Sequence, residues 1–232
     1  VIELVREGRI SEERIDQSAA KLLKLKFDLG LFEDPYVDTS RAASVVGSAE
    51  FKAAGYRAQL ESIVLLANDG TLPLSESALD ITPNRITARR TKIFTVGVDT
   101  DIANRYAAVV DDPQDADVAI IKVNTGGIQL SEETLAIVDS VVKTGVPVVL
   151  VVNFDRAPTV IPPELVEQTA AMVGTFDVLD EALFDVLFGR FNPVGKLPFQ
   201  IPSTMESVEA QLEDVPFDLE NPTFEFGHGL SY

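Results

Sequence analysis

Two runs of β-branched residues, separated by one helical stretch, constrain the fold of this chain most. The runs are DVAIIKV at 117–123 and VPVVLVV at 146–152, and the stretch between them has the pattern of a helix from Ser131 to about Lys143. Strands this uniformly apolar are covered on both faces, and amphipathic helices between such strands are typical of parallel sheets. The pattern therefore predicts an α/β fold built on a mainly parallel sheet.

The same alternation of strands and helices extends to both sides of these runs. Further strands are expected at 62–68, 92–98 and 170–176. Further helices are expected from Ser48 to about Glu61, near 100–107 and at 179–188. The pattern therefore continues over most of the chain, and it predicts helices on both faces of the sheet.

The two ends of the chain differ from this pattern. Residues 1–47 are expected to form a helical segment and a linker, with Ser11 as the helix cap and Gly30 as its end. The chain opens inside a helical pattern rather than on methionine, so we expect it to be an excised piece of something longer. Residues 48–199 would form the α/β domain. Residues 200–232 would form a tail that wraps this domain.

Composition excludes several classes of function. The chain has 37 acidic and 19 basic residues, a net charge of −18, which repels polyanions, so nucleic acid is not expected as a partner. With no cysteine and one histidine, the chain offers neither a disulfide framework nor the ligands of a zinc site, and we expect no metal and no cofactor. No apolar run is long enough to span a membrane, and no signal peptide is recognisable at the N-terminus. The cellular compartment stays open.

The only histidine, His228, lies between two glycines in FGHGLSY at the end of the chain. A catalytic histidine would need a nucleophile within reach, but the chain has no cysteine and no nearby Gly-x-Ser-x-Gly turn. The glycines instead allow a tight backbone turn. We interpret His228 as a structural residue.

Four segments resemble a known family when they are taken together and in order. They are the helical stretch at 2–38, ESIVLLANDGTLPL at 61–74, DVLFGRFNPVGKLPF at 185–199 and FEFGHGLSY at 224–232. In order and spacing they resemble the second half of glycoside hydrolase family 3, the β-glucosidase and β-xylosidase type. The resemblance implies a three-layer α/β sandwich with about six strands, preceded by a helix and linker that join it to a barrel.

The resemblance also implies a mechanism and shows what this chain lacks. The family retains configuration by using a carboxylate nucleophile and an acid of raised pKa. The nucleophile lies on the barrel, whose sequence we do not recognise here, and in many members the acid lies on a long sandwich loop after a central strand. The matching connection at 124–130 is short and contains two glycines. Glu132 and Glu133, which follow it, are the weak candidates for the acid, although glutamates after the N-cap Ser131 are also ordinary helix-start residues.

Four other groups of polar residues follow expected strands. Asp99 and Asp101, after 92–98, are candidates for binding sugar hydroxyls, because ligands of open α/β sheets bind at the carboxyl ends of the strands. Asp155 and Arg156 are the second candidate pair, although such a pair is more often structural.

Asn68-Asp69-Gly70 is interpreted as a turn in which Asn and Gly supply positive φ, and Asp180-Glu181 as helix-capping residues.

Three functional hypotheses remain open. The chain is the sandwich portion of a family 3 β-glycosidase that acts with a barrel domain on another chain, or a reduced or engineered stand-alone scaffold, or a carbohydrate-binding module for a neutral saccharide. Gly126-Gly127 favours the scaffold, because a glycine pair can close a gap left by a deletion. In each case we predict that the chain is inactive alone; its sugar, linkage and oligomeric state are not given by the sequence.

Overall fold

The fold is taken from a computed structural model, which describes residues 1–82, 85–156 and 158–232. The chain divides into two compact units, Val1–Lys52 and Ala53–Tyr232. The first unit is helical and has no buried residue. Its elements are α1 (Ile2–Arg6), α2 (Glu12–Asp28), the short 3-10 helix η1 (Thr39–Arg41), α3 (Ala42–Val45) and the start of α4 (Ala49–Ser62).

The predicted cap of α2 is present. The Ser11 hydroxyl accepts a hydrogen bond from the Arg14 N–H at 3.2 Å, which satisfies one of the free amides of the first turn. Gly30 follows the helix with φ of +66°, a conformation that glycine adopts at little cost. The helix expected between Ser11 and Gly30 is therefore confirmed.

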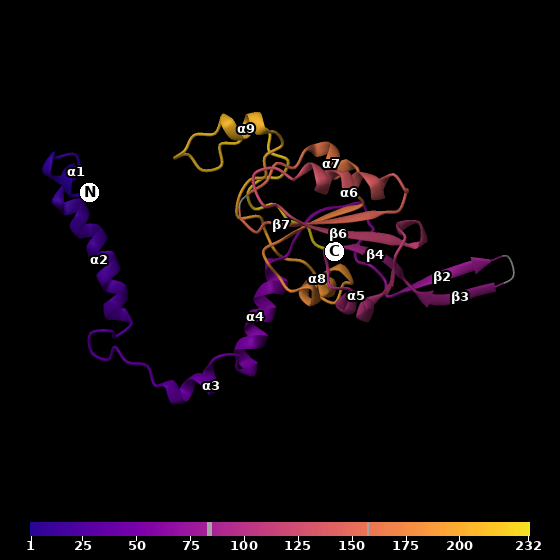
Figure 1. The fold of residues 1–232 in the computed structure, drawn as a ribbon, viewed down its shortest axis with the longest axis horizontal. Helices are drawn as coiled ribbons and strands as arrows, with labels where there is room; N and C mark the ends of the chain where they lie inside the picture. Colours follow the sequence, from indigo (N-terminus) through magenta and orange to yellow (C-terminus); the bar gives the residue numbers. More distant parts are fainter. Residues whose placement is uncertain (83–84, 157) are drawn as a thin grey trace. The chain divides into compact units, whose positions relative to one another are not determined.

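The second unit is built on a six-stranded sheet with the order β1-β8-β7-β6-β4-β5 (Figure 1). All neighbouring strands are parallel except β1, which pairs antiparallel with β8. The strands are β1 (Val64–Asn68), β4 (Lys92–Val96), β5 (Ala108–Val110), β6 (Val118–Asn124), β7 (Val148–Asn153) and β8 (Ala171–Thr175). The mainly parallel sheet expected from the sequence is confirmed.

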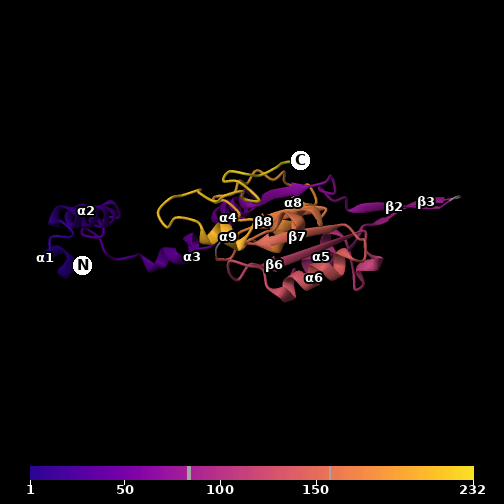
Figure 2. The same ribbon diagram turned by 90° about the horizontal axis from the view of Figure 1, so that it is seen from above.

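Helices cover both faces of this sheet (Figures 1 and 2). One hydrophobic core lies between the sheet and α5 (Thr100–Tyr106) and α8 (Asp180–Leu187). The other lies against α6 (Glu132–Val142) and α7 (Pro163–Glu167). Along β7, Val149 and Val151 join the first core, whereas Val148, Leu150 and Val152 join the second. This alternation explains why the sequence of a central strand is apolar throughout, and it confirms the three-layer sandwich.

Two strands of the second unit stand outside the sheet. β2 (Ser77–Thr82) and β3 (Arg85–Arg90) follow β1 and precede β4 in the chain, and they form a separate antiparallel hairpin. This hairpin was not expected from the sequence. The short strand β5 and the helix α7 were not expected either. A short 3-10 helix η2 (Pro113–Asp115) follows β5, and α9 (Met205–Glu209) lies in the tail.

The turn after β1 is confirmed, with one correction to its geometry. The Asn68 side chain accepts hydrogen bonds from the N–H groups of Gly70 and Leu72 at 3.2 and 3.0 Å. Gly70 has φ of +106°, but Asn68 does not have positive φ. Asn68 therefore shapes this turn through its side chain, as Asx turns do, and Gly70 alone supplies the left-handed backbone.

The C-terminal tail returns to β1. The Leu230 N–H donates to the Leu65 carbonyl at 2.8 Å, and the His228 Nε2 lies 2.8 Å from the Leu66 carbonyl, so this nitrogen carries the proton in the contact. The edge of β1 that faces away from β8 is thus covered by the FGHGLSY segment. The structural interpretation of His228 agrees with this geometry.

Candidate functional site

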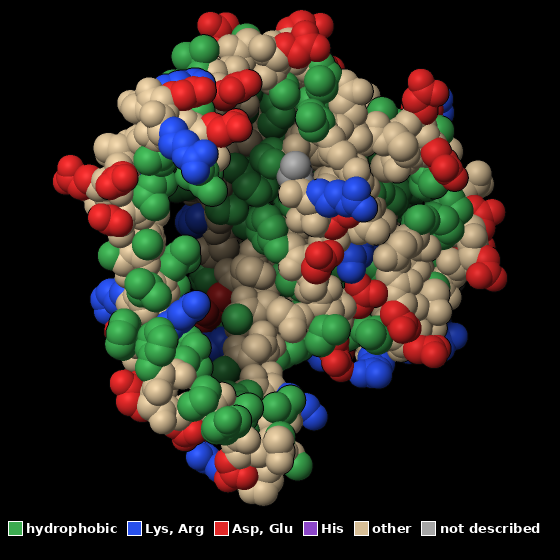
Figure 3. All heavy atoms as spheres, turned by 60° about the vertical axis from the view of Figure 1, so that its left-hand side comes forward, with side chains coloured by type: hydrophobic (Ala, Val, Ile, Leu, Met, Phe, Trp, Pro, Cys, Tyr) green, Lys and Arg blue, Asp and Glu red, His purple; other side chains and the backbone are tan. Residues whose placement is uncertain are grey.

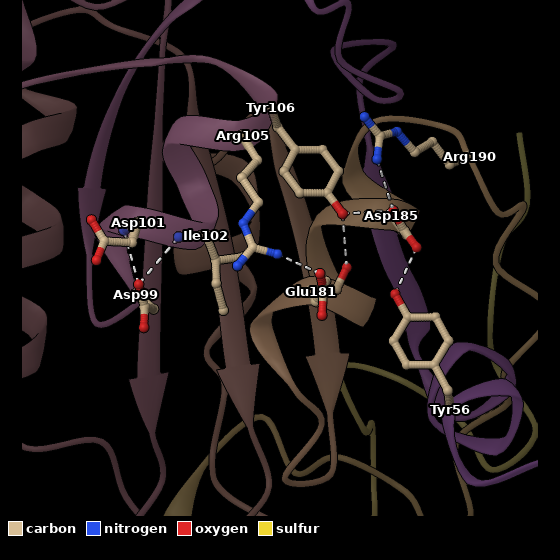
Figure 4. Close-up of polar contacts among 9 residues, drawn as sticks. All are labelled: Tyr56, Asp99, Asp101, Ile102, Arg105, Tyr106, Glu181, Asp185 and Arg190. Carbon is tan, nitrogen blue, oxygen red and sulfur yellow. Dashed lines mark hydrogen bonds and ion pairs between the residues drawn. The ribbon is translucent and has the colours of Figure 1, made fainter. Parts of the chain in front are cut away.

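The carboxyl ends of the parallel strands carry the polar residues that the sequence singled out. Asp99 follows β4 and caps α5: its Oδ1 accepts hydrogen bonds from the N–H groups of Asp101 and Ile102 at 2.8 and 3.1 Å (Figure 4). Asp101 lies in the first turn of the same helix with an exposed side chain. The two aspartates are therefore close together, but one Asp99 oxygen is committed to the helix end.

A partly buried ion pair that the sequence did not indicate lies beside this helix end. Lys122 Nζ of β6 donates to Asp180 Oδ1 of α8 at 2.7 Å, and the two side chains are 15% and 14% exposed. The other Asp180 oxygen accepts the Asp99 N–H at 2.7 Å. The backbone at Gly97, directly after β4, lies close to the backbone of Lys122. Only glycine fits there, since a Cβ at that position would lie 2.1 Å from the Lys122 carbonyl oxygen.

The interpretation of Asp180 and Glu181 as capping residues is wrong. The N-cap of α8 is Leu179, which makes no side-chain capping bond. Asp180 binds Lys122, and Glu181 forms a 2.6 Å ion pair with Arg105 of α5. Both carboxylates thus connect elements far apart in the sequence instead of closing the first turn of their own helix.

Asp155, the candidate after β7, is held by the loop that follows β6. Its Oδ1 accepts hydrogen bonds from the Gly126 N–H at 3.0 Å and the Thr125 hydroxyl at 2.8 Å. These bonds, that of Gly126 first, lower the pKa of the Asp155 carboxyl. Arg156 is exposed, and its Nε lies 3.9 Å from Asp155 Oδ2, so the pair does not form a two-bond fork. Because β6 separates β4 from β7, the strands that these two candidate pairs follow are two strand spacings apart, about 10 Å.

A second polar group at this edge centres on the buried side chain of Asn153, the last residue of β7. Its amide donates to Asn124 and Asp177 at 3.0 and 2.7 Å, and its carbonyl accepts from the Thr175 hydroxyl at 3.0 Å. Every one of these bonds joins the ends of β6, β7 and β8. Asn153 is therefore fully used in holding the strand ends together.

The candidates for the acid, Glu132 and Glu133, form the exposed first turn of α6. Ser131 caps this helix by accepting the Thr134 N–H at 3.1 Å. The preceding loop is tied down, since the Val160 N–H donates to the Ile128 carbonyl at 2.6 Å. The two glutamates are therefore placed where helix-start carboxylates usually lie, on a connection that is held against its own domain.

A further polar cluster joins three helices (Figure 4). The hydroxyls of Tyr56 in α4 and Tyr106 in α5 each donate to Asp185 of α8 at 2.6 Å. Arg190 lies over the Tyr106 ring, 4.2 Å from its centroid, and binds Glu76 at 2.7 Å. Burial, together with the bonds to Asp185, raises the pKa of both tyrosines. No sequence pattern indicates this cluster, whose members lie up to 134 positions apart in the chain.

Residues for other kinds of site are absent from the part of the chain that the structure describes. Within residues 1–82, 85–156 and 158–232, no group of three His, Cys, Asp or Glu side chains is arranged to hold a metal ion. Over the same residues, none of the helices combines the length and the apolar character that crossing a bilayer requires. An apolar hollow of about 380 Å³ lies between the loops after β6 and β7 and the tail, lined by Ile128, Phe199 and Phe217 among others.

Comparison with known proteins agrees with this architecture. Residues 63–232 match the model of the glycosyl hydrolase family 3 C-terminal domain. A probable β-glucosidase C of Aspergillus oryzae is 40% identical over 247 residues. This match covers the whole of this chain and 37% of the fungal protein. A periplasmic β-glucosidase/β-xylosidase of Dickeya chrysanthemi is 31% identical over the whole chain and 36% of its own length.

A solved structure shares the fold. The crystal structure of a β-glucosidase from Listeria innocua in complex with glucose matches 99% of this chain and 40% of its own, with a TM-score of 0.68 and 23% identity. The chain thus spans little more than a third of the length of the curated relatives named above. The family model covers most of the chain and all six strands of the sheet. The chain belongs to glycoside hydrolase family 3, of which it contains the C-terminal domain.

Proposed function

We propose that this chain acts as one part of a β-glycosidase, together with a barrel domain that carries the nucleophile, and that residues 1–232 alone do not hydrolyse glycosides. The observation that supports this most is coverage: relatives named as β-glucosidases match the whole chain with little more than a third of their length. The remaining two thirds of such proteins offer ample length for the nucleophile and the sugar-binding residues. The substrate would be a neutral saccharide with a terminal β-linked sugar.

The geometry of the strand ends supports the second half of this proposal. Retaining hydrolysis needs two carboxyl groups about 5–5.5 Å apart, one of which has a raised pKa and donates the proton. Asp155 has a lowered pKa and stays ionised, and Asp180 is bound to Lys122. Glu132 and Glu133 form the first turn of α6, directly after a loop that is pinned to its own domain. None of these carboxylates is placed to protonate a leaving group.

The first unit supports the participation of a second domain. Residues 1–52 contain no buried side chain, and α2 exposes Leu22, Leu25 and Phe27 to the extent of 65%, 59% and 59%. A helix of 17 residues with such a surface is normally stabilised by packing against a core. We propose that residues 1–47 join the sandwich to the barrel and that α2 packs on it.

The direct test is an assay of the chain on an aryl β-glucoside. We expect no release of the aryl group above buffer alone, whereas turnover on the order of 1 s⁻¹ or faster by the chain alone would contradict the proposal. A second sample contains the N-terminal part of the Aspergillus oryzae relative, added in trans, and hydrolysis only in the mixture is the expected positive result. If the mixture is active, the variant Glu132→Gln/Glu133→Gln should be as active as the unaltered chain.

The carbohydrate-binding hypothesis predicts that the same purified chain binds a sugar without hydrolysing the aryl β-glucoside. Titration with glucose, followed by NMR chemical shifts, would then give saturable binding without turnover. Shifts confined to Asp99 and Asp101 or to Asp155 and Arg156 would favour that hypothesis for the corresponding strand end.

A further inference from the structure

The apolar hollow between the strand-end loops and the tail has the size and the position of a ligand site. Its volume of about 380 Å³ lies within the roughly 300–1,000 Å³ that small-molecule pockets occupy. Its lining includes Ile128 from the loop after β6 and Pro158 from the segment after β7. β6 and β7 are neighbouring parallel strands, so the hollow lies beyond the carboxyl ends of both, where open α/β sheets bind ligands.

The buried part of the lining is aromatic and rigid. The Phe199 ring meets the rings of Phe154 and Phe176 edge to face, with centroids 5.4 and 6.1 Å apart. Gln200 and Pro202, which also line the hollow, are buried. The Phe199 ring is therefore fixed before any ligand binds, which lowers the entropy cost of binding.

A second aromatic ring, that of Phe217, is held at the exposed rim of the hollow. Phe217 has φ of +60°, a left-handed conformation that bulky residues rarely adopt. Its ring packs on that of Phe226, with centroids 4.3 Å apart, yet Phe217 remains 50% exposed. Backbone strain is common at ligand clamps, so strain that brings so little burial indicates a binding role for this ring.

Gln200 brings unused hydrogen-bonding capacity to the buried part of the lining. Its amide donates to Glu225 Oε2 at 2.7 Å and accepts the Leu219 N–H at 3.2 Å. An amide has two N–H groups and two lone pairs on its oxygen, so one N–H and one lone pair are left over. A ligand hydroxyl can accept from that N–H or donate to that oxygen, so Gln200 suits a ligand that carries a hydroxyl.

Incomplete hydrogen bonding is concentrated beside the hollow. Among the side chains that the structure describes, two buried oxygens lack a hydrogen-bond partner, Thr159 Oγ1 and Asp218 Oδ1. Thr159 directly follows the lining residue Pro158. Asp218 lies between Phe217 and Leu219, which also line the hollow. Because buried groups of this kind are rare and cost stability, they indicate that these walls are shaped for a ligand rather than for stability alone.

Charge limits the class of ligand. Acidic side chains are spread over the face of the molecule that Figure 3 shows, and the chain has a net charge of −18, which repels anions. The described residues that line the hollow include no charged side chain, so a cation would find no partner there. The many hydroxyls of a sugar would also lack partners on this apolar lining. The ligand that fits is therefore neutral and largely apolar.

We propose that this hollow binds a small neutral aromatic molecule with a hydroxyl group, whose rings lie against Phe199 and Phe217 and whose hydroxyl bonds to the Gln200 amide. Aromatic pairs prefer offset-stacked or edge-to-face contacts, which the two phenylalanine rings offer. All of the lining residues belong to the unit Ala53–Tyr232, so binding needs no barrel. Binding here is thus separate from glycoside hydrolysis, and either can be absent without the other.

The test is a titration of 2-naphthol, a fluorescent two-ring phenol, with the chain, followed by fluorescence anisotropy. The chain has no tryptophan, so the probe is excited without a background from indole. We expect one site with a Kd on the order of 100 μM, as for a ligand of about ten heavy atoms. 2-Methoxynaphthalene keeps the rings but cannot donate a hydrogen bond, and it should bind about fivefold more weakly.

Two variants remove apolar groups from different walls of the hollow. Phe217→Gly removes the ring at a φ that glycine adopts without strain. Ile128→Ser shortens a side chain that is 47% exposed, in the loop after β6. Each should raise the Kd about fivefold or more while the urea midpoint changes little. The control Phe51→Ala removes a ring that is 57% exposed on α4 and is not part of the lining, and it should leave the Kd within about twofold.

Each other outcome overturns the proposal. No saturable change in anisotropy up to about ten times the expected Kd shows that the hollow does not bind such a molecule. A Kd that stays unchanged in either wall variant, or that rises as much in Phe51→Ala, places the probe elsewhere on the chain. Equal affinity for 2-methoxynaphthalene contradicts the bond to Gln200. Displacement of 2-naphthol by glucose assigns the hollow to a sugar instead.

Discussion

The close packing of the C-terminal FGHGLSY segment leads to a quantitative prediction about Gly229. A Cβ at this position would lie 2.3 Å from the Gly195 carbonyl oxygen and 3.1 Å from the Lys196 Cδ. Ordinary contact between a carbon and an oxygen needs at least about 3.2 Å, so Gly229→Ala must move the segment by close to 1 Å.

A displacement of this size weakens the bonds that hold the segment to β1. The Leu230 N–H donates to Leu65 at 2.8 Å, and Lys196 Nζ donates to the Gly229 carbonyl at 2.5 Å. Each such bond is worth about 1 kcal/mol, and overpacking adds about 1–3 kcal/mol. We expect Gly229→Ala to lower the free energy of unfolding by about 3 kcal/mol, which for a chain of this size lowers Tm by roughly 6–12 °C.

The control is Gly227→Ala in the same segment. Gly227 has φ of +78°, but its added Cβ would meet nothing within 4 Å, so only the backbone strain of about 1–2 kcal/mol remains. Urea unfolding followed by circular dichroism at 222 nm compares the two variants. If Gly229→Ala is no more destabilising than Gly227→Ala, the close approach of Gly229 to the Gly195 carbonyl does not make an added Cβ costly to the free energy of unfolding.

Three further predictions concern the polar contacts. Lys122→Met should destabilise the fold by about 2–4 kcal/mol in urea unfolding, because it leaves the partly buried Asp180 carboxylate without its cation. The double variant Lys122→Met/Asp180→Asn should recover most of this loss. The hydrogen bonds from Arg89 lower the pKa of Asp117, so the contribution of Asp117 to the free energy of unfolding is present above the ordinary carboxyl pKa of about 4 and is lost as pH falls below it. Asp117→Asn should therefore flatten the pH dependence of the urea midpoint between about pH 5 and 3. An unchanged slope would contradict this. Tyr56→Phe removes the bond from α4 to the carboxylate in α8 and should speed amide hydrogen exchange in the second half of α4, while exchange in β6 serves as the unaffected reference.

The sequence predicted the central sheet well for a physical reason. β6 and β7 lie between two cores, so their side chains are apolar except for Lys122 and the terminal Asn124 and Asn153, and the run is visible without knowledge of its neighbours. β2 and β3 do not pack between cores, and their Asp, Thr and Arg residues give no continuous run. Elements outside the cores therefore escaped detection.

The site was predicted less completely because its chemistry depends on distant partners. Asp99 was recognised as a strand-end residue. Its N–H, however, donates to Asp180, which also binds Lys122, and this contact depends on the packing of α8, since Asp180 lies 58 positions after Lys122. The same holds for Asp185, which two tyrosines reach from 129 and 79 positions away. Residue types alone identified strand ends and helix starts, but not which carboxylates were already bound.

Three of the four segments that carry the family resemblance, at 61–74, 185–199 and 224–232, meet in space. A Cβ on Gly195 would lie 2.4 Å from the Ile63 carbonyl oxygen, and one on Gly229 would lie 2.3 Å from that of Gly195. β1, the loop around Gly195 and the FGHGLSY segment are therefore stacked backbone on backbone, with His228 bound to the Leu66 carbonyl. Such packing tolerates no added carbon atom and depends on no substrate. A chain of this family can thus keep these segments for the stability of one sheet edge while its loop at 124–130 contains no Asp or Glu, so the presence of these segments reports the fold and not a catalytic group.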